Sequence, residues 1–126
     1  MARKKASGQP FNIMIVGQGG RLQYEAVLFV ASLRSNSPNF QGRVIVVEPQ
    51  DGPLWQKDPR MNAEIKEVLL DMGAEIAPFE SKHFGQQYPY GNKIEGLSAM
   101  PAGEPFVFFD TDTLVMGDIE SIPFDF

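Results

Sequence analysis

The sequence predicts an α/β protein built on a Rossmann-like, open and mostly parallel sheet with flanking helices. Two observations lead to this prediction. Four short apolar runs recur along the chain with helical segments between them, and three of the four are continuously apolar rather than alternating. Continuous runs are typical of strands that are buried on both faces of a parallel sheet. The alternation of strands and helices implies right-handed crossovers, and it places a bound ligand at the carboxyl ends of the strands.

The apolar runs locate four strands. The continuous runs are residues 13–16, 44–47 and 106–109. Residues 76–79 form a weaker run that contains Pro78. Proline has no backbone N–H to donate to a neighbouring strand, so this run predicts an edge strand or the end of a strand.

Three helices are predicted between these strands. Residues 24–35 are almost entirely apolar, which predicts a largely buried helix. The second helix is expected to have Asp58 as its N-cap and Pro59 at its first position, and to end at Gly73. A short third helix is predicted over residues 93–100.

Composition limits the domain organisation and the possible ligands. The chain has 126 residues, enough for one hydrophobic core, and we expect residues 1–10 to form a flexible basic tail and residues 11–126 a single α/β domain. Cysteine is absent and His83 is the one histidine, so any bound metal would be held by oxygen atoms. The net charge of −5 argues against nucleic-acid binding. Because no apolar run suits a signal peptide or a membrane span, we expect a cytoplasmic protein.

Two aspartates separated by one residue follow the last predicted strand. Asp110 and Asp112 come directly after the apolar run 106–109. Carboxylates at this spacing on the end of a strand can converge on one hard cation, and the cation can bind the oxygens of a diphosphate. The alternative is a structural turn in which the aspartates accept hydrogen bonds from backbone amides.

The same segment carries a resemblance to a known family. Residues 108–119 resemble the metal-binding segment of glycosyltransferases with the GT-A fold, particularly the family 8 type that includes glycogenin and bacterial lipopolysaccharide galactosyltransferases. Residues 25–34 resemble the first helix of that family. Residues 92–97 resemble its segment with a basic residue at a similar distance before the metal motif. The resemblance covers most of the chain, and its most specific part is the Asp-x-Asp motif.

The resemblance implies a metal-dependent hexosyltransferase and a set of site residues. Asp110 and Asp112 would hold Mn²⁺ or Mg²⁺, which bridges the diphosphate of a nucleotide sugar, with a UDP-sugar as the expected donor. Thr111, between them, would lie against the donor. Lys93 would contact the donor sugar or the first aspartate, and we expect Lys93 and the two aspartates to be the catalytic residues. The alternative for Lys93 is an exposed lysine at a helix start.

A glycine-rich loop and a strand-end acid are further candidates. Gly17 and Gly19 follow the first strand and precede the first helix, so their amides could face a phosphate. In the transferase interpretation this loop lies beside the nucleoside, which makes Arg21 and Tyr24 candidate contacts as well. Glu48 ends the second strand, where an acid can accept a hydrogen bond from a ribose hydroxyl. Equally, the glycines can serve a simple chain reversal and Glu48 can be a solvated acid.

Other functions remain open at this point. Residues 106–115 also approximate the signature of haloacid-dehalogenase-type phosphatases, although only 14 residues follow Asp112. Residues 17–20 with Glu48 fit a Rossmann-type binder of a dinucleotide or S-adenosylmethionine, and a noncatalytic nucleotide-binding module is a third class.

In the GT-A family, acceptor residues and a further metal ligand follow the Asp-x-Asp segment. We therefore expect the chain to be the donor-binding half of a transferase, truncated after that segment. The acceptor is unknown and could be a glycan, a lipid-linked sugar or a protein. We also expect an exposed sheet edge that favours self-association.

Overall fold

A four-stranded parallel sheet forms the centre of the molecule. The structure is a computed structural model that describes residues 10–87 and 91–122. The strands are β1 (Asn12–Val16), β2 (Val44–Pro49), β3 (Glu75–Phe79) and β4 (Phe106–Phe108). Their order in the sheet is β3-β2-β1-β4, and every neighbouring pair is parallel. The predicted α/β class with a Rossmann-like open sheet is confirmed. Residues 1–9 of the predicted tail lie outside the described part.

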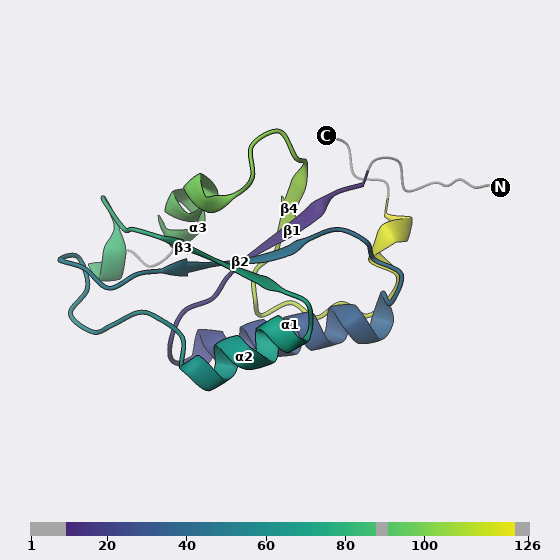
Figure 1. Ribbon diagram of the computed structural model, residues 1–126, viewed down its shortest axis with the longest axis horizontal. Coiled ribbons are helices and arrows are strands. Elements are labelled where there is room, and N and C mark those ends of the chain that lie inside the picture. The colour runs from purple at the N-terminus through teal and green to yellow at the C-terminus, as the bar shows by residue number, and fades with distance from the viewer. Residues whose placement is uncertain (1–9, 88–90, 123–126) are drawn as a thin grey trace.

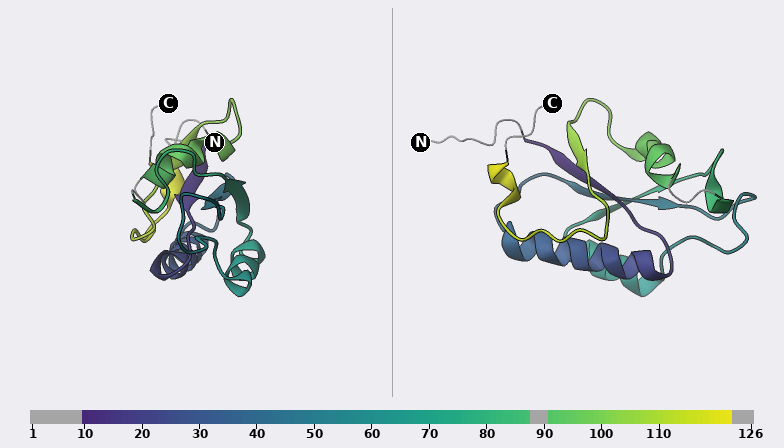
Figure 2. Two further views of the ribbon diagram at one scale, coloured as in Figure 1. Left: turned by 90° about the vertical axis from the view of Figure 1, so that its left-hand side faces the viewer. Right: turned by 180° about the vertical axis from the view of Figure 1, so that it is seen from behind.

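Helices cover both faces of the sheet. The helices α1 (Arg21–Asn36) and α2 (Ala63–Asp71) lie on one face, and the short α3 (Asn92–Glu95) lies on the other, followed directly by the 3-10 helix η3 (Gly96–Ala99) (Figures 1 and 2). The chain moves outward from β1 to β2 and β3, then returns to β4 on the other side of β1. Since crossovers are right-handed, this reversal moves the connecting helix to the opposite face. The carboxyl ends of β1 and β4 therefore flank the topological switch point of the sheet, where ligands bind in such folds.

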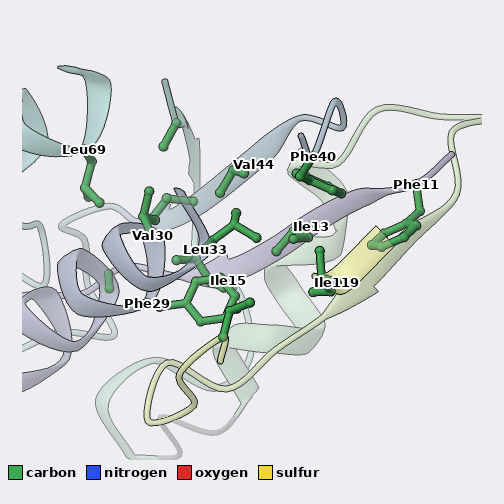
Figure 3. Packing of buried hydrophobic residues seen from close by; sticks show 14 of the residues in the cluster. Phe11, Ile13, Ile15, Phe29, Val30, Leu33, Phe40, Val44, Leu69 and Ile119 are labelled. Atoms are coloured by element: carbon green, nitrogen blue, oxygen red, sulfur yellow. The ribbon is translucent and has the colours of Figure 1, made fainter. Parts of the chain in front are cut away.

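The strands divide their side chains between two cores. Ile13 and Ile15 face α1 and α2, whereas Met14 between them packs with Ile45 and Val47 on the opposite face. This division explains why the apolar runs are continuous, because both faces of β1 and β2 are covered. Figure 3 shows the larger core, in which β1 and β2 meet the helices and the C-terminal segment, with these side chains labelled: Phe11, Ile13, Ile15, Phe29, Val30, Leu33, Phe40, Val44, Leu69 and Ile119.

The first helix differs from its prediction in extent and in burial. α1 begins three residues earlier than expected, and its outward side is not buried: Tyr24 is 55% exposed and Leu28 is 59% exposed. The polar Gln23 is buried instead, and its Oε1 accepts a hydrogen bond from the backbone N–H of Asn62 at 2.8 Å. The expectation of a largely buried helix was wrong because only the side towards the sheet is covered.

The second helix begins later than predicted. α2 starts at Ala63, so Asp58 is not its N-cap. The Asp58 carboxylate instead accepts hydrogen bonds from the backbone N–H and the guanidinium of Arg60, which lower the pKa of Asp58 to about 2. The end of the helix is as predicted, since Gly73 adopts a φ of 84° directly after the C-cap Met72.

The remaining elements follow the predictions with smaller changes. β3 is the outermost strand on its side of the sheet, as the proline in it indicates. The third predicted helix is divided between α3 and η3. Two more 3-10 helices, η1 (Gly85–Gln87) and η4 (Ile119–Ser121), lie in the loop before α3 and near the C-terminus. Within the described residues, the helices are all too short or too polar to cross a membrane.

Candidate functional site

A cavity of about 600 Å³ lies at the switch point of the sheet. Its walls are the carboxyl ends of β1 and β4, the loop after β1, the first turns of α1, the start of α3, and the turn that follows β4. Asp110, Thr111, Asp112 and Lys93 all line it. The structure thus brings together, in one cavity, the four residues that the Asp-x-Asp motif and its upstream lysine single out.

The two aspartates occupy a tight turn directly after β4. The backbone N–H of Thr113 donates to the carbonyl oxygen of Asp110 at 3.1 Å, which closes the turn. Both aspartates are exposed, and within residues 10–87 and 91–122 neither carboxylate forms an ion pair. Thr111, between them, points its hydroxyl at α1, where it donates to Glu25 Oε1 at 3.3 Å. The two carboxylates that the motif predicts as ligands therefore have no ion-pair partner in the part of the chain that the structure describes.

Glu25 connects this turn to the N-terminus of α1. Its second oxygen lies 3.0 Å from the Arg21 guanidinium Nε, while its first accepts from Thr111. Arg21 is the first residue of α1, and no side chain caps this end of the helix. The charge of Arg21 is balanced by Glu25, and the uncapped amides at this end of α1 favour an anion.

The chain after the aspartate turn runs back along α1. The hydroxyl of Ser32 accepts a hydrogen bond from the backbone N–H of Val115 at 2.8 Å. The Asn36 side-chain amide donates to the carbonyl oxygen of Val115 at 2.7 Å. Ser37, next to the end of the helix, donates to the Gly117 carbonyl at 2.6 Å and accepts from the N–H of Ile119 at 2.7 Å. This return path beside α1 can be followed in the rear view of Figure 2. Sequence reasoning missed these contacts, although polar residues on an apolar helix were a usable signal.

Lys93 projects from α3 over the end of β4. Its Nζ lies 5.7 Å from the centroid of the Phe108 ring, a cation–π contact. The side chain is exposed and, like the aspartates, makes no ion pair with any residue in the described part of the chain. The cavity therefore holds a lysine that is supported by an aromatic ring and available to an anionic or polar ligand.

The glycine loop has a different role from the one expected. The N–H of Gly17 donates to the carbonyl of Val47 at 2.9 Å, and that of Gly19 donates to the carbonyl of Pro59 at 2.8 Å. These two amides are therefore engaged within the protein and do not face the cavity as a phosphate site. Glycine is required at position 17 for packing, since a Cβ there would lie 2.4 Å from Val46 Cγ1. Tyr24 is exposed on α1 and does not line the cavity either.

Glu48 also lies outside the cavity. Only 2% of the residue is exposed, and its carboxylate accepts from the backbone N–H of Met61 at 2.8 Å and pairs with Lys66 Nζ at 3.1 Å. These contacts attach the end of β2 to the chain that leads into α2. Glu48 therefore holds these two segments together inside the protein and does not serve as an acceptor for a ribose hydroxyl.

The loop before α3 is fixed by a carboxylate. Glu95 accepts hydrogen bonds from the backbone N–H groups of Lys82 at 2.6 Å, His83 at 3.1 Å and Phe84 at 3.2 Å. Partial burial raises the pKa of Glu95, but the three N–H donors lower it by more, so the pKa lies below its ordinary value. His83 itself is exposed, as expected of a loop residue. This network fixes the position of α3 and hence of Lys93.

Two polar residues in the cavity wall were not singled out from the sequence. Asn92, at the start of α3, is 2% exposed and donates through Nδ2 to Oε1 of Gln18 at 2.7 Å. Gln18 follows β1, so the contact joins the two sides of the cavity. Both residues lie in segments considered above, residues 17–20 and 92–97, but neither was named as a site residue, and the sequence carries no signal that Asn92 is buried.

The donor atoms of the cavity fit a hard divalent cation. Asp110 and Asp112 supply carboxylate oxygens, the ligands that Mg²⁺ and Mn²⁺ prefer. Within the described residues, no group of three or more histidine, aspartate or glutamate side chains could hold a metal ion. A cation bound by two carboxylates keeps most of its coordination positions for water and ligand oxygens, which is typical of Mg²⁺ at phosphate-binding sites.

Comparison with known proteins gives a family assignment. A search of curated proteins finds no match. Residues 13–126 match the model of the Rhodobacterales glycosyltransferase domain, and this range includes the sheet except for the first residue of β1, the helices and every residue that lines the cavity. This match extends over most of the chain, and the chain therefore belongs to the Rhodobacterales glycosyltransferase domain family.

Proposed function

We propose that this chain binds the nucleotide-sugar donor of a metal-dependent glycosyltransferase of the GT-A type, similar to family 8, with a UDP-sugar as donor. One observation carries the proposal. Asp110, Asp112 and Lys93 share the switch-point cavity, and none of them forms an ion pair with a described residue. Membership of a glycosyltransferase family favours sugar transfer over the phosphatase and Rossmann-type alternatives.

The charges of the cavity support binding of a diphosphate together with a cation. Two carboxylates in one turn repel each other, and a divalent cation between them removes this repulsion. A diphosphate alone would be repelled by the same carboxylates, so we expect nucleotide and metal to bind cooperatively. Asp110 and Asp112 would hold Mn²⁺ or Mg²⁺, which acts when bound as a Lewis acid that stabilises the departing nucleotide diphosphate.

The surrounding residues have roles that follow from their positions. The uncapped N-terminus of α1 favours the negative charge of the diphosphate, and Arg21, which is paired with Glu25, lies at the same end of the helix. Lys93, above the Phe108 ring, can bind the donor sugar or a phosphate oxygen. Glu25 keeps the aspartate turn in place through Thr111. Preorganised charges of this kind lower the barrier to departure of the leaving group because they need not reorient during the reaction.

Titration calorimetry of UDP tests the proposal. UDP is titrated into the wild-type chain with and without Mn²⁺, and into an Asp110→Asn/Asp112→Asn variant. We expect binding that requires Mn²⁺ and that weakens at least tenfold in the variant, because a neutral amide oxygen binds a divalent cation more weakly than a carboxylate does. An Asp51→Asn/Asp71→Asn variant removes the same two charges from exposed positions outside the cavity and should bind as the wild type does. Binding that is independent of both Mn²⁺ and the aspartates would contradict the proposal.

A further inference from the structure

The Gln18–Asn92 contact leaves one buried polar atom without a partner. Asn92 Nδ2 donates to Gln18 Oε1, but among the described residues Asn92 Oδ1 accepts no hydrogen bond although it is buried. An unpaired buried acceptor destabilises the folded state, and such atoms are rare in folded proteins. Both residues line the switch-point cavity. An unused acceptor in the wall of a binding site indicates that a ligand supplies the missing donor.

We propose that the Gln18–Asn92 amide pair determines specificity by binding a neutral hydroxyl or N–H group of the nucleotide sugar. This inference rests on the proposed function. Asn92 Oδ1 accepts the hydrogen bond from the ligand, and Gln18 adds its Nε2 as a donor beside it. Asn92 makes the ligand contact directly, and Gln18, which is half-buried, closes over it and opens when the ligand enters.

The chemistry of the pair selects this class of ligand group. A phosphate oxygen carries no proton, so it would repel Asn92 Oδ1 rather than satisfy it. A sugar hydroxyl or a nucleobase imide both donates and accepts hydrogen bonds, which matches an amide oxygen next to an amide nitrogen. The position agrees with this assignment, because the pair joins the loop after β1 to α3 directly beside Lys93. The diphosphate belongs near the aspartates and α1, and the neutral part of the donor belongs near the amide pair.

The test compares variants of the pair with UDP and UDP-glucose as probes. Calorimetry with Mn²⁺ is carried out on Gln18→Ala and Asn92→Ala. Gln41→Ala is the matched control, since the Gln41 side chain is exposed and donates to the nearby carbonyl of Asn39, outside the cavity. Gln18 is half-buried, so Gln18→Ala should fold even if the buried Asn92→Ala variant does not, and thermal unfolding verifies the fold of each. We expect the dissociation constant to rise about five- to tenfold for the pair variants and to stay unchanged for the control.

The outcomes separate the possible sources and the possible failures. A rise for both probes places a nucleoside group at the pair, and a rise for UDP-glucose alone places a sugar hydroxyl there; either result supports the proposal. Unchanged binding of both probes by folded variants overturns it. A loss of Mn²⁺ affinity in the absence of nucleotide also overturns it, because Asn92 would then be a metal ligand. If the wild type binds neither probe, the proposed function itself fails and the inference fails with it.

Discussion

Replacing Ser37 with alanine removes both hydrogen bonds by which this residue holds the segment after the aspartate turn. Ser37 is 1% exposed, and its hydroxyl donates to the Gly117 carbonyl while accepting from the N–H of Ile119. Gly117 is exposed, so its carbonyl can bind water instead. Ile119 is buried, so its N–H is left without a partner. One lost hydrogen bond and one orphaned buried N–H together cost about 2–3 kcal/mol.

Urea unfolding followed by circular dichroism measures this loss. For a chain of this length, about 2–3 kcal/mol corresponds to a fall in Tm of roughly 10 °C. Ser98→Ala is the matched control, because the Ser98 hydroxyl donates to the carbonyl of Glu95 at 2.9 Å on an exposed surface. It should change stability by less than about 0.5 kcal/mol. Equal stability of the two variants would refute the account of how the aspartate segment is held against α1.

Three further predictions concern the framework of the site. Lys66→Met leaves the buried carboxylate of Glu48 without its counter-ion and should cost about 3 kcal/mol in urea unfolding. Because the pKa of Glu95 is lowered in the folded state, its contribution is complete above pH 4.5 and is lost as the pH falls through the folded-state pKa. Glu95→Gln should therefore be less stable at neutral pH and show a weaker decline of Tm in acid. Gly17→Ala should cost about 1–3 kcal/mol through steric overlap, whereas Gly52→Ala, with no atom within 4 Å of the new Cβ, should be nearly neutral in thermal unfolding.

The sheet could be predicted from the sequence because its two central strands, β1 and β2, are buried on both faces. Continuous apolar runs identified β1, β2 and β4, and Pro78 indicated the outer position of β3. Helix ends were harder to predict. Asp58 looked like an N-cap, but its carboxylate binds Arg60 instead, and only the three-dimensional path of the chain decides between these two partners.

The candidate site was predictable where a local pattern marks it. Asp110 and Asp112 stand out because they follow an apolar strand, and the structure places them in the cavity with Lys93. For Glu48 and the glycine amides, the sequence could not show whether they face a ligand or other parts of the protein. Their partners lie on other elements, such as Lys66 for the carboxylate of Glu48. Burial depends on contacts that are distant in sequence, so a strand-end acid looks the same whether it binds a ligand or anchors a loop.

Paramagnetic broadening by Mn²⁺ tests the central claim most directly, because it locates the metal on the folded chain. In two-dimensional NMR spectra of the protein with UDP, small additions of Mn²⁺ should first broaden the backbone amide signals of Asp110, Thr111 and Asp112. The signals of Gln18 and Asn92, across the cavity, should follow. The same additions to the Asp110→Asn/Asp112→Asn variant should leave these signals sharp. Broadening centred on another acidic surface, such as the exposed Glu64 and Glu67 of α2, would contradict the account.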